Sequence, residues 1–318
     1  MTSLTDESPT VRPPGTNIAL PPLTPATIKR ATEGLAAARN QHARAAVEHS
    51  LVNGEALLEG RPERRMSGAG RRRLLQAMLA PLVQVRIEHP ENVPTTPCML
   101  APNHLNHIDP FLMLATMPAT PYFYVLGDAR TLYNKAWKRQ LIRRVGGVIP
   151  LDRIWKEEMA VLEGVKSGHA ELADLAAAIT HDVPDGGSYN ALRRLDRIVQ
   201  GIFARGDSVL IFPEGGLGTI EGQLRAPLKR GAVIYAMRAG VPIVPVGISG
   251  NRDLYLRKQI TVRFGPPLDF GQADRPKPRV VQGALDTLEA AIRSLIDPNY
   301  QDPPGPKLLR HTLNHMLW

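Results

Sequence analysis

Short apolar runs alternate with longer amphipathic stretches from about residue 83 to residue 296, and this alternation limits the possible folds more than any other feature of the chain. The short runs have the length and turn-rich borders of buried strands, whereas the longer ones repeat apolar residues at helical spacing. The predicted strands are 83–87, 98–101, 122–126, 148–151, 208–212, 243–248 and 260–264. The predicted helices are 110–117, 135–145, 192–204, 226–239 and 280–296. The alternation predicts an α/β domain with a mostly parallel central sheet flanked by helices.

Differences in composition along the chain predict where this domain begins and ends and which segments flank it. Residues 1–24 are rich in Pro, Thr and Ser and predict a flexible tail, whereas the Ala-rich stretch 25–70 predicts a small N-terminal helical region. The α/β domain is expected to span 71–300 and to contain an insertion at 163–190, where an amphipathic helix precedes a turn-rich segment. Residues 301–318 form an amphipathic C-terminal tail in this division.

The chain carries a formal net charge of +9, which predicts an anionic partner. The basic cluster of Arg61, Arg64, Arg65 and 71–73 contains no aromatic residue and is followed by leucines, which favours a membrane surface over nucleic acid. No apolar run reaches the roughly 18 residues of a spanning helix. A single cysteine, Cys98, can form no internal disulfide, which fits a reducing, cytoplasmic setting.

Two amphipathic stretches predict contact with an anionic membrane face. In the first, 71–73 adjoin apolar residues at helical spacing up to Leu82, and in the second, the C-terminal tail ends at Trp318. The apolar positions of the tail are Leu308, Leu309, Thr312, Leu313, Met316 and Leu317. The alternative for either stretch is that its apolar side packs against the protein core.

His104 and Asp109 are the first candidates for chemistry, because they directly follow a predicted strand. Asp109 and Pro110 read as the N-cap and first residue of a helix, so a short turn is expected to bring the carboxylate beside the imidazole. A carboxylate on one ring nitrogen fixes the tautomer and leaves the other nitrogen free to take a proton from a hydroxyl.

The spacing of this pair is weak evidence alone, because His169 and Asp174 repeat it. The second pair lies in a helical pattern, where five positions place two side chains about 140° apart around the axis. His169 is therefore predicted to be a solvated surface residue.

Two further segments end strands with residues that suit a polar ligand. Glu214 and Gly215 follow Phe212-Pro213 at the end of the apolar run 209–211, where glycine lets backbone amides approach an anion and a carboxylate can receive hydroxyls. Arg153 stands just past the strand 148–151, and arginine is suited to bidentate recognition of phosphate. The alternatives are a plain Gly-rich turn and a surface ion pair, respectively.

Taken in order, four segments resemble the motif blocks of the glycerolipid acyltransferases, in particular the 1-acylglycerol-3-phosphate (lysophosphatidate) acyltransferases. They are Asn103-His104-x4-Asp109, Gly147-x5-Arg153, Phe212-Pro213-Glu214-Gly215 and the run 241–246, Val-Pro-Ile-Val-Pro-Val. The resemblance covers about residues 74–270 and implies the family's α/β fold.

The resemblance implies transfer of a fatty acyl group from acyl-CoA or acyl-carrier protein to a lysophospholipid hydroxyl, in phospholipid biosynthesis and without a cofactor. His104 would be the general base and Asp109 its orienting partner, while Asn103, Arg153, Glu214, Gly215 and Lys229 would contact substrate.

The family commonly continues the third block with Thr-Arg, whereas this chain has Gly216-Leu217. A phosphate-binding arginine is therefore missing, and Arg225 and Lys229, which follow the same turn, are the candidates to replace it.

Other functions remain open at this level. Glycerol 3-phosphate or another lysolipid is the alternative acceptor, and a non-catalytic lipid-binding protein of the same fold is the non-enzymatic alternative. A hydrolytic metal site of His104, His107 and Asp109 is a second enzymatic alternative, but no further ligands are evident. Nucleic-acid binding is a further alternative class.

Overall fold

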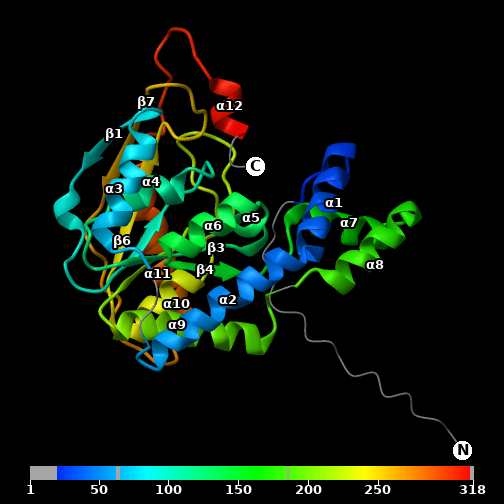
Figure 1. The fold of residues 1–318 in the computed structure, drawn as a ribbon, viewed down its shortest axis with the longest axis horizontal. Coiled ribbons are helices and arrows are strands. Elements are labelled where there is room, and N and C mark those ends of the chain that lie inside the picture. The colour runs from blue at the N-terminus through cyan, green and yellow to red at the C-terminus, as the bar shows by residue number, and fades with distance from the viewer. Residues whose placement is uncertain (1–19, 62–64, 185, 316–318) are drawn as a thin grey trace, which may run out of the picture.

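The computed structural model describes residues 20–61, 65–184 and 186–315. A seven-stranded sheet forms its centre, in the order β1-β7-β6-β2-β5-β3-β4 (Figure 1). All neighbouring strands are parallel except β6 and β7, which are antiparallel, so the predicted mostly parallel sheet is confirmed. The strands are β1 (Val83–Glu88), β2 (Met99–Pro102), β3 (Phe123–Asp128), β4 (Val148–Leu151), β5 (Ser208–Leu210), β6 (Ile243–Ser249) and β7 (Lys258–Phe264).

Helices cover both faces of this sheet, as the alternation predicts. One buried cluster joins the sheet to α3 (Gly68–Leu79) and α4 (Asp109–Thr116) through Leu75, Leu112 and Phe264. A second cluster joins the opposite face to α9 (Tyr189–Ala204), α10 (Gly231–Ala239) and α11 (Pro278–Leu295). The remaining helices of the main body are α2 (Gln41–Leu58), α5 (Ala129–Tyr133), α6 (Ala136–Val145) and α12 (Arg310–His315). These two apolar layers hold in place the ends of the strands, which carry the candidate site residues.

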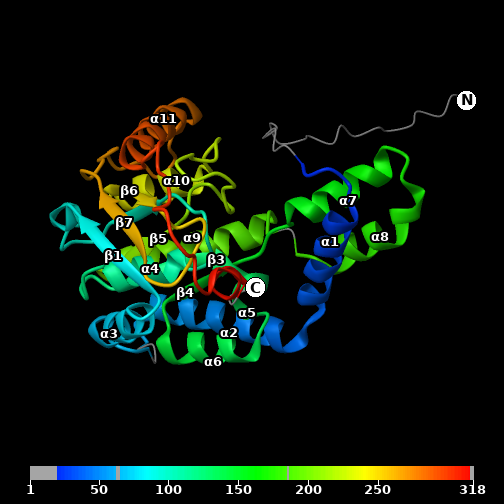
Figure 2. The same ribbon diagram turned by 90° about the horizontal axis from the view of Figure 1, so that it is seen from above.

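The N-terminal helix and the predicted insertion pack together into an arm that projects from the main body (Figures 1 and 2). The arm consists of α1 (Pro25–Arg39), α7 (Lys156–Lys166) and α8 (Ala173–Asp182), which share a small apolar core that includes Ala31, Val161 and Ile179. Residues 1–19 of the predicted flexible tail lie outside the described residues.

Three local expectations differ from the structure. The predicted helix 226–239 begins only at Gly231, because Pro227 disfavours a helical Ala226 and the preceding backbone turns back so that the Lys229 amide donates to Pro213 O at 2.7 Å. The strand 208–212 ends at Leu210. His169 is exposed, as predicted, but it lies between α7 and a short 3-10 helix rather than inside a helix, and it bonds to Glu171 instead of Asp174.

The expectation that the basic cluster faces a membrane is wrong for two of its members. Arg71 is only 3% exposed, donates to Phe123 O at 2.9 Å and stacks on the Tyr122 ring. Arg65 also stacks on Tyr122 and donates to Tyr124 Oη at 2.6 Å. Both arginines are held by aromatic side chains at β3, which lie far away in the sequence, whereas Arg64 lies outside the described residues.

The apolar stripe of α3 mainly faces the core, whereas the C-terminal stripe does so only through Leu313 among its described residues. Leu75 and Leu79 of α3 are buried, which contradicts a membrane role for them, although Met78 remains 45% exposed. In the C-terminal tail Leu313 packs into the core, while Leu308 and Leu309 stay 60% and 54% exposed. Met316, Leu317 and Trp318 lie outside the described residues. Within the described ranges no helix is long and apolar enough to span a bilayer.

Candidate active site

His104 follows β2 directly and forms the predicted pair with Asp109. The distance from His104 Nδ1 to Asp109 Oδ2 is 2.9 Å, and the imidazole is 15% exposed while the carboxylate is fully buried. Asp109 begins α4 but does not cap it, because Ile108 occupies the N-cap position. Its Oδ2 instead accepts the backbone amides of Leu105 and Asn106 at 2.8 and 2.9 Å. The predicted capping role is therefore wrong, and the carboxylate closes the loop that carries His104.

Asn251 completes this group and was not predicted from the sequence. Its Nδ2 donates to Asp109 Oδ1 at 2.8 Å, and the side chain is fully buried. Asn251 follows β6, which lies next to β2 in the sheet. Ligand-facing polar residues tend to gather at the carboxyl ends of such strands, so its place just after the fourth motif block is the signal that could have indicated it.

The ring of His104 also stacks on Phe212, with the two centroids 4.1 Å apart. The hydrogen bond to Asp109 fixes Nδ1 as the donor, so Nε2 carries the lone pair of the neutral imidazole. Stacking, the loop amides and the buried carboxylate together hold the ring in one orientation. The arrangement can remove a proton from a hydroxyl placed against Nε2.

Glu214 is buried behind the loop 103–109, which carries His104 and is called the catalytic loop below. One carboxylate oxygen accepts the His104 amide at 2.5 Å and the other accepts the Arg225 amide at 2.7 Å. Burial raises the pKa of Glu214 to about 7, although the two amide donors act in the opposite direction. The carboxylate thus joins His104 to the segment after β5, whereas the sequence suggested that it binds a substrate hydroxyl.

Three basic side chains gather around Gly215 and Gly216. Arg153 donates through Nε to Asp128 at 2.6 Å and through Nη1 to the Gly215 carbonyl. A Cβ atom on Gly216 would lie 2.6 Å from Arg225 Nη1, and one on Gly215 would lie 2.8 Å from the Lys229 side chain. Gly215 also has a φ of +65°, which favours glycine.

The electrostatics of this group fit an anion site. Burial lowers the pKa of Lys229, and the positive charges of Arg225 and Arg153 lower it further. Arg225 and Lys229 make no ion pair with any side chain that the structure describes. The family commonly has an arginine at the position of Leu217, directly after this turn. Because Gly216 has no side chain, the Arg225 guanidinium can occupy the space beside the same turn. Three cations with a single acidic partner can accommodate a phosphate.

Asn103 has a different position from the one its predicted role requires. It is 1% exposed, its Nδ2 donates to Ile248 O at 3.0 Å and its Oδ1 accepts the Ile248 amide at 2.6 Å. Both polar atoms therefore join β2 to β6, and we do not assign the side chain a substrate contact.

The metal alternative gains no support from the side chains around the loop. Both oxygens of Asp109 already accept hydrogen bonds. Within the described part of the chain, no three His, Cys, Asp or Glu side chains are grouped as metal ligands.

A histidine oriented by a buried carboxylate at the end of a central parallel strand, next to a basic turn, is the kind of site that transfers a group onto a hydroxyl. The family model for the acyltransferases matches residues 84–249, which include His104, Asp109, Arg153 and Glu214. This match extends over more than half of the chain, and the chain belongs to the acyltransferase family.

Individual relatives match more narrowly. The human 1-acyl-sn-glycerol-3-phosphate acyltransferase alpha is 34% identical over 86 residues, which are 25% of this chain and only 30% of that protein. The crystal structure of the 1-acyl-sn-glycerophosphate (LPA) acyltransferase PlsC from Thermotoga maritima aligns with 85% of this chain and 86% of that chain. Its sequence identity is 15% and its TM-score is 0.39.

Proposed function

We propose that this protein is an O-acyltransferase that transfers a fatty acyl group from acyl-CoA or acyl-carrier protein to a hydroxyl of a lysophospholipid, 1-acylglycerol-3-phosphate, in phospholipid biosynthesis. The observation that carries the proposal is the His104–Asp109–Asn251 group, in which two buried side chains orient one accessible imidazole. Membership of the acyltransferase family supports the type of reaction.

The proposed reaction requires no covalent enzyme intermediate. His104 Nε2 takes the proton of the acceptor hydroxyl while the hydroxyl oxygen attacks the thioester carbonyl carbon. The carbon–sulfur bond then breaks, and the leaving thiolate takes the proton from the imidazolium. Cys98 does not serve as a nucleophile in this scheme, because it is fully buried and burial raises the pKa of its thiol to about 12.

The acceptor phosphate binds in this proposal to Arg153, Arg225 and Lys229. The three side chains meet at the turn that follows Glu214, and Glu214 is itself bonded to the His104 amide. A phosphate held there would keep the glycerol hydroxyl of the same molecule near the imidazole, and such fixed orientation lowers the barrier to attack.

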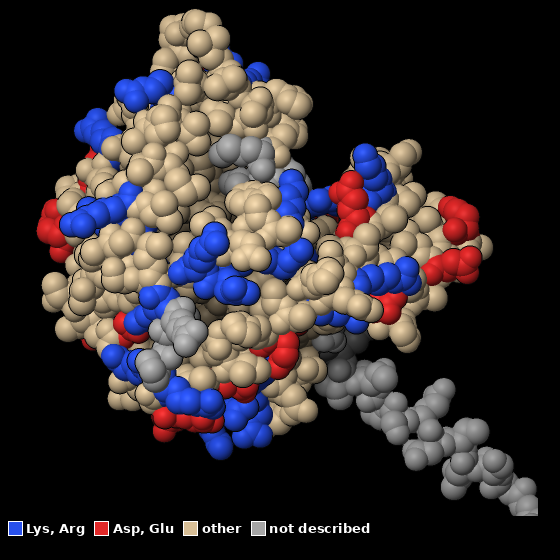
Figure 3. Space-filling view, viewed as in Figure 1, with Lys and Arg blue, Asp and Glu red and all other residues tan. Residues whose placement is uncertain are grey.

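We also propose that the enzyme works on an anionic membrane face, because a lysophospholipid acceptor resides there. Lys and Arg side chains gather across the middle of one face of the molecule, over α6 (Figure 3). Arg143 and Arg144 of this helix are exposed, and Trp137 is 45% exposed. Exposed Leu308 and Leu309 offer additional apolar contacts. Basic residues near anionic lipid contribute about 1 kcal/mol each.

Release of free thiol from acyl-CoA, measured with a panel of acceptors, tests the function. We expect the highest kcat/KM with 1-acylglycerol-3-phosphate and a much lower value with an unphosphorylated monoacylglycerol. Highest activity on glycerol 3-phosphate or on another lysolipid would assign that acceptor instead. Binding of these lipids without any transfer from acyl-CoA or acyl-carrier protein would identify a lipid-binding protein of this fold and contradict the proposal.

A further inference from the structure

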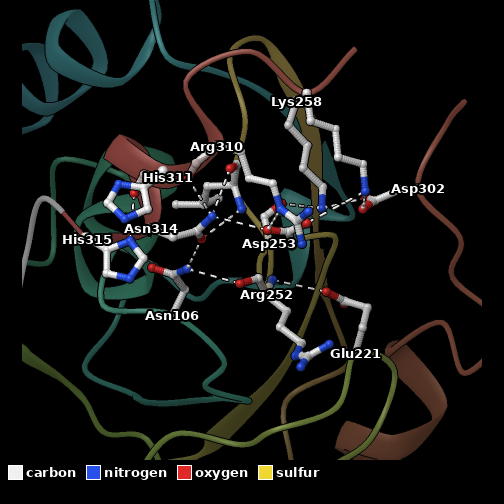
Figure 4. Close-up of polar contacts among 12 residues, drawn as sticks. Asn106, Glu221, Arg252, Asp253, Lys258, Asp302, Arg310, His311, Asn314 and His315 are labelled. Carbon is white, nitrogen blue, oxygen red and sulfur yellow. Dashed lines mark hydrogen bonds and ion pairs between the residues drawn. The ribbon is translucent and has the colours of Figure 1, made fainter. Parts of the chain in front are cut away.

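A cavity of about 820 Å³ lies between the catalytic loop and the C-terminal segment, as the close-up in Figure 4 shows in part. The catalytic loop contributes Leu105, Asn106 and His107 to one wall, directly after His104 in the sequence. The segment 217–221 contributes a second wall, and α12 contributes a third. The volume is within the range typical of small-molecule sites.

Specific contacts hold the C-terminal wall in place. Asn314 Oδ1 accepts the Leu254 amide at 2.9 Å, and its Nδ2 donates to the Leu254 carbonyl at 3.0 Å. Asn314 also meets Asn106 of the catalytic loop at 3.4 Å, while the neighbouring Leu313 is buried. This wall lies beyond residues 84–249, so a segment outside the family match completes the cavity.

The charges around the cavity fall into two groups. Lys258 pairs with Asp302 at 2.7 Å, and Arg310 pairs with Asp253 at 2.9 Å, so these four groups are largely neutralised. Arg252 differs: its backbone amide donates to Glu221, but its exposed guanidinium forms no ion pair within the described ranges. Figure 4 shows this side chain extending away from the ion pairs.

Two histidines on α12 border the same cavity. The exposed rings of His311 and His315 stack with centroids 4.3 Å apart, and both border the same cavity as Arg252. The Glu221 carboxylate accepts the Gly250 and Arg252 amides, which reduces its capacity to repel an anion. The rim therefore combines two imidazoles with an exposed arginine that forms no ion pair within the described ranges, while the side-chain amides of Asn106 and Asn314 hold the walls together.

We propose that this cavity binds the phosphopantetheine arm of the acyl donor, with Arg252, His311 and His315 facing its phosphate. The proposal rests on the proposed acyl transfer and deepens it. The arm carries an anionic phosphate, which matches the exposed Arg252 guanidinium, and the two exposed imidazoles can hydrogen-bond to the phosphate oxygens. Its thioester end would lie towards the loop that carries His104.

The position of the other basic site supports this assignment. Arg153, Arg225 and Lys229 surround Gly215 and Gly216, and none of the three lines the cavity. Two anionic reactants must meet at one imidazole, and separate basic sites allow both to bind without competing for the same cations. Acyl-CoA and acyl-carrier protein share the phosphopantetheine arm, so either donor fits.

Isothermal titration with coenzyme A and with 4′-phosphopantetheine tests binding without turnover. Arg252→Ala should weaken binding of both probes about tenfold, because one charge-assisted contact is lost, and Arg252→Glu should weaken it more. Arg252→Lys should retain part of the affinity. The double variant His311→Ala/His315→Ala should also weaken binding, whereas Arg279→Ala and His42→Ala, which replace exposed residues of α11 and α2, should not.

Kinetics separate the donor site from the acceptor site. Arg252→Ala should raise the KM for the donor about tenfold and leave the KM for the acceptor unchanged. Comparison of acyl-CoA with acyl-carrier protein as donors distinguishes the two sources of the arm. Unchanged affinity and unchanged donor KM in both Arg252→Ala and Arg252→Glu would overturn the proposal, as would failure of the wild-type protein to bind coenzyme A, 4′-phosphopantetheine or holo-carrier protein. Tight binding with no acyl transfer would instead refute the proposed function and leave the cavity assignment standing.

Discussion

Asn251 Nδ2 lies 2.8 Å from Asp109 Oδ1, and both side chains are completely buried. The contact joins the segment after β6 to the first residue of α4 and occupies the carboxylate oxygen that His104 leaves free. It therefore makes the orientation of the imidazole depend on a residue more than 140 positions away in the sequence.

We expect Asn251→Ala to lower kcat by about 10- to 100-fold with little change in either KM, because a misplaced base mainly affects the transition state. Asn251→Asp should be worse, since it places a second carboxylate against Asp109, and it should also displace the pH–rate profile. Asn299→Ala, at an exposed position, is the control. Wild-type kcat together with a wild-type pH profile in Asn251→Ala would contradict the positioning role.

His104→Ala should reduce kcat by about 10²-fold or more, the usual loss for a general base, without a large change in melting temperature. His169→Ala removes the exposed histidine that has the same spacing to an aspartate and should leave activity unchanged. Measurement of thiol release for both variants provides the comparison. Near-full transfer by His104→Ala would end the proposed mechanism.

Arg225→Ala should raise the KM for 1-acylglycerol-3-phosphate about tenfold and leave the KM for an unphosphorylated monoacylglycerol unchanged. Gly216→Ala should act in the same direction, because the new Cβ would lie 2.6 Å from Arg225 Nη1 and displace the guanidinium. Arg153→Ala should also raise the KM for the phosphorylated acceptor more than it lowers kcat. Equal effects on both acceptors would show that these residues do not bind phosphate.

The raised pKa of Glu214 predicts that the stability of the protein depends on pH. The pKa of Glu214 is raised from 4.5 to about 7 in the folded protein, so between these values the native state binds more protons than the unfolded state. This group therefore lowers the free energy of unfolding as pH rises through that window, by up to about 3 kcal/mol at about 1.4 kcal/mol per pKa unit. His107, whose pKa falls to about 4, acts in the opposite sense below pH 6.5.

The comparison with Glu214→Gln isolates this contribution. At pH 5 the variant should be less stable than the wild type. This difference in stability should shrink as the pH rises to 8. Thermal melts across this range provide the measurement. A constant difference between the two proteins at every pH would be inconsistent with a raised pKa.

Sedimentation with vesicles tests the proposed membrane face. Binding should require anionic lipid, weaken with added salt and fall at least tenfold in Arg143→Glu/Arg144→Glu, since each basic residue contributes about 1 kcal/mol. Arg279→Glu provides a control on α11, and Leu308→Ser/Leu309→Ser tests the apolar contribution of the C-terminal segment. Salt-resistant binding to neutral vesicles would contradict the electrostatic part, and no binding to any vesicle would refute the membrane role.

The sequence by itself determined the α/β architecture and the pairing of His104 with Asp109. Strand and helix periods are local properties, so the order of elements could be predicted from them. His104 and Asp109 are also local, because only five positions separate them and Pro110 favours the start of a helix directly after the carboxylate.

Only the tertiary structure decided which other side chains meet this pair. Asn251 reaches Asp109 because β6 lies next to β2, and Arg71 is buried against Tyr122, directly before β3, and the Phe123 carbonyl. The C-terminal segment reaches the catalytic loop through Asn314, which bonds to Asn106 across more than 200 positions. Hydrophobic periodicity records which face of an element is buried but not which element covers it. For Asn251 the pairing of strands makes that choice, because it brings the carboxyl ends of β2 and β6 to the same edge of the sheet.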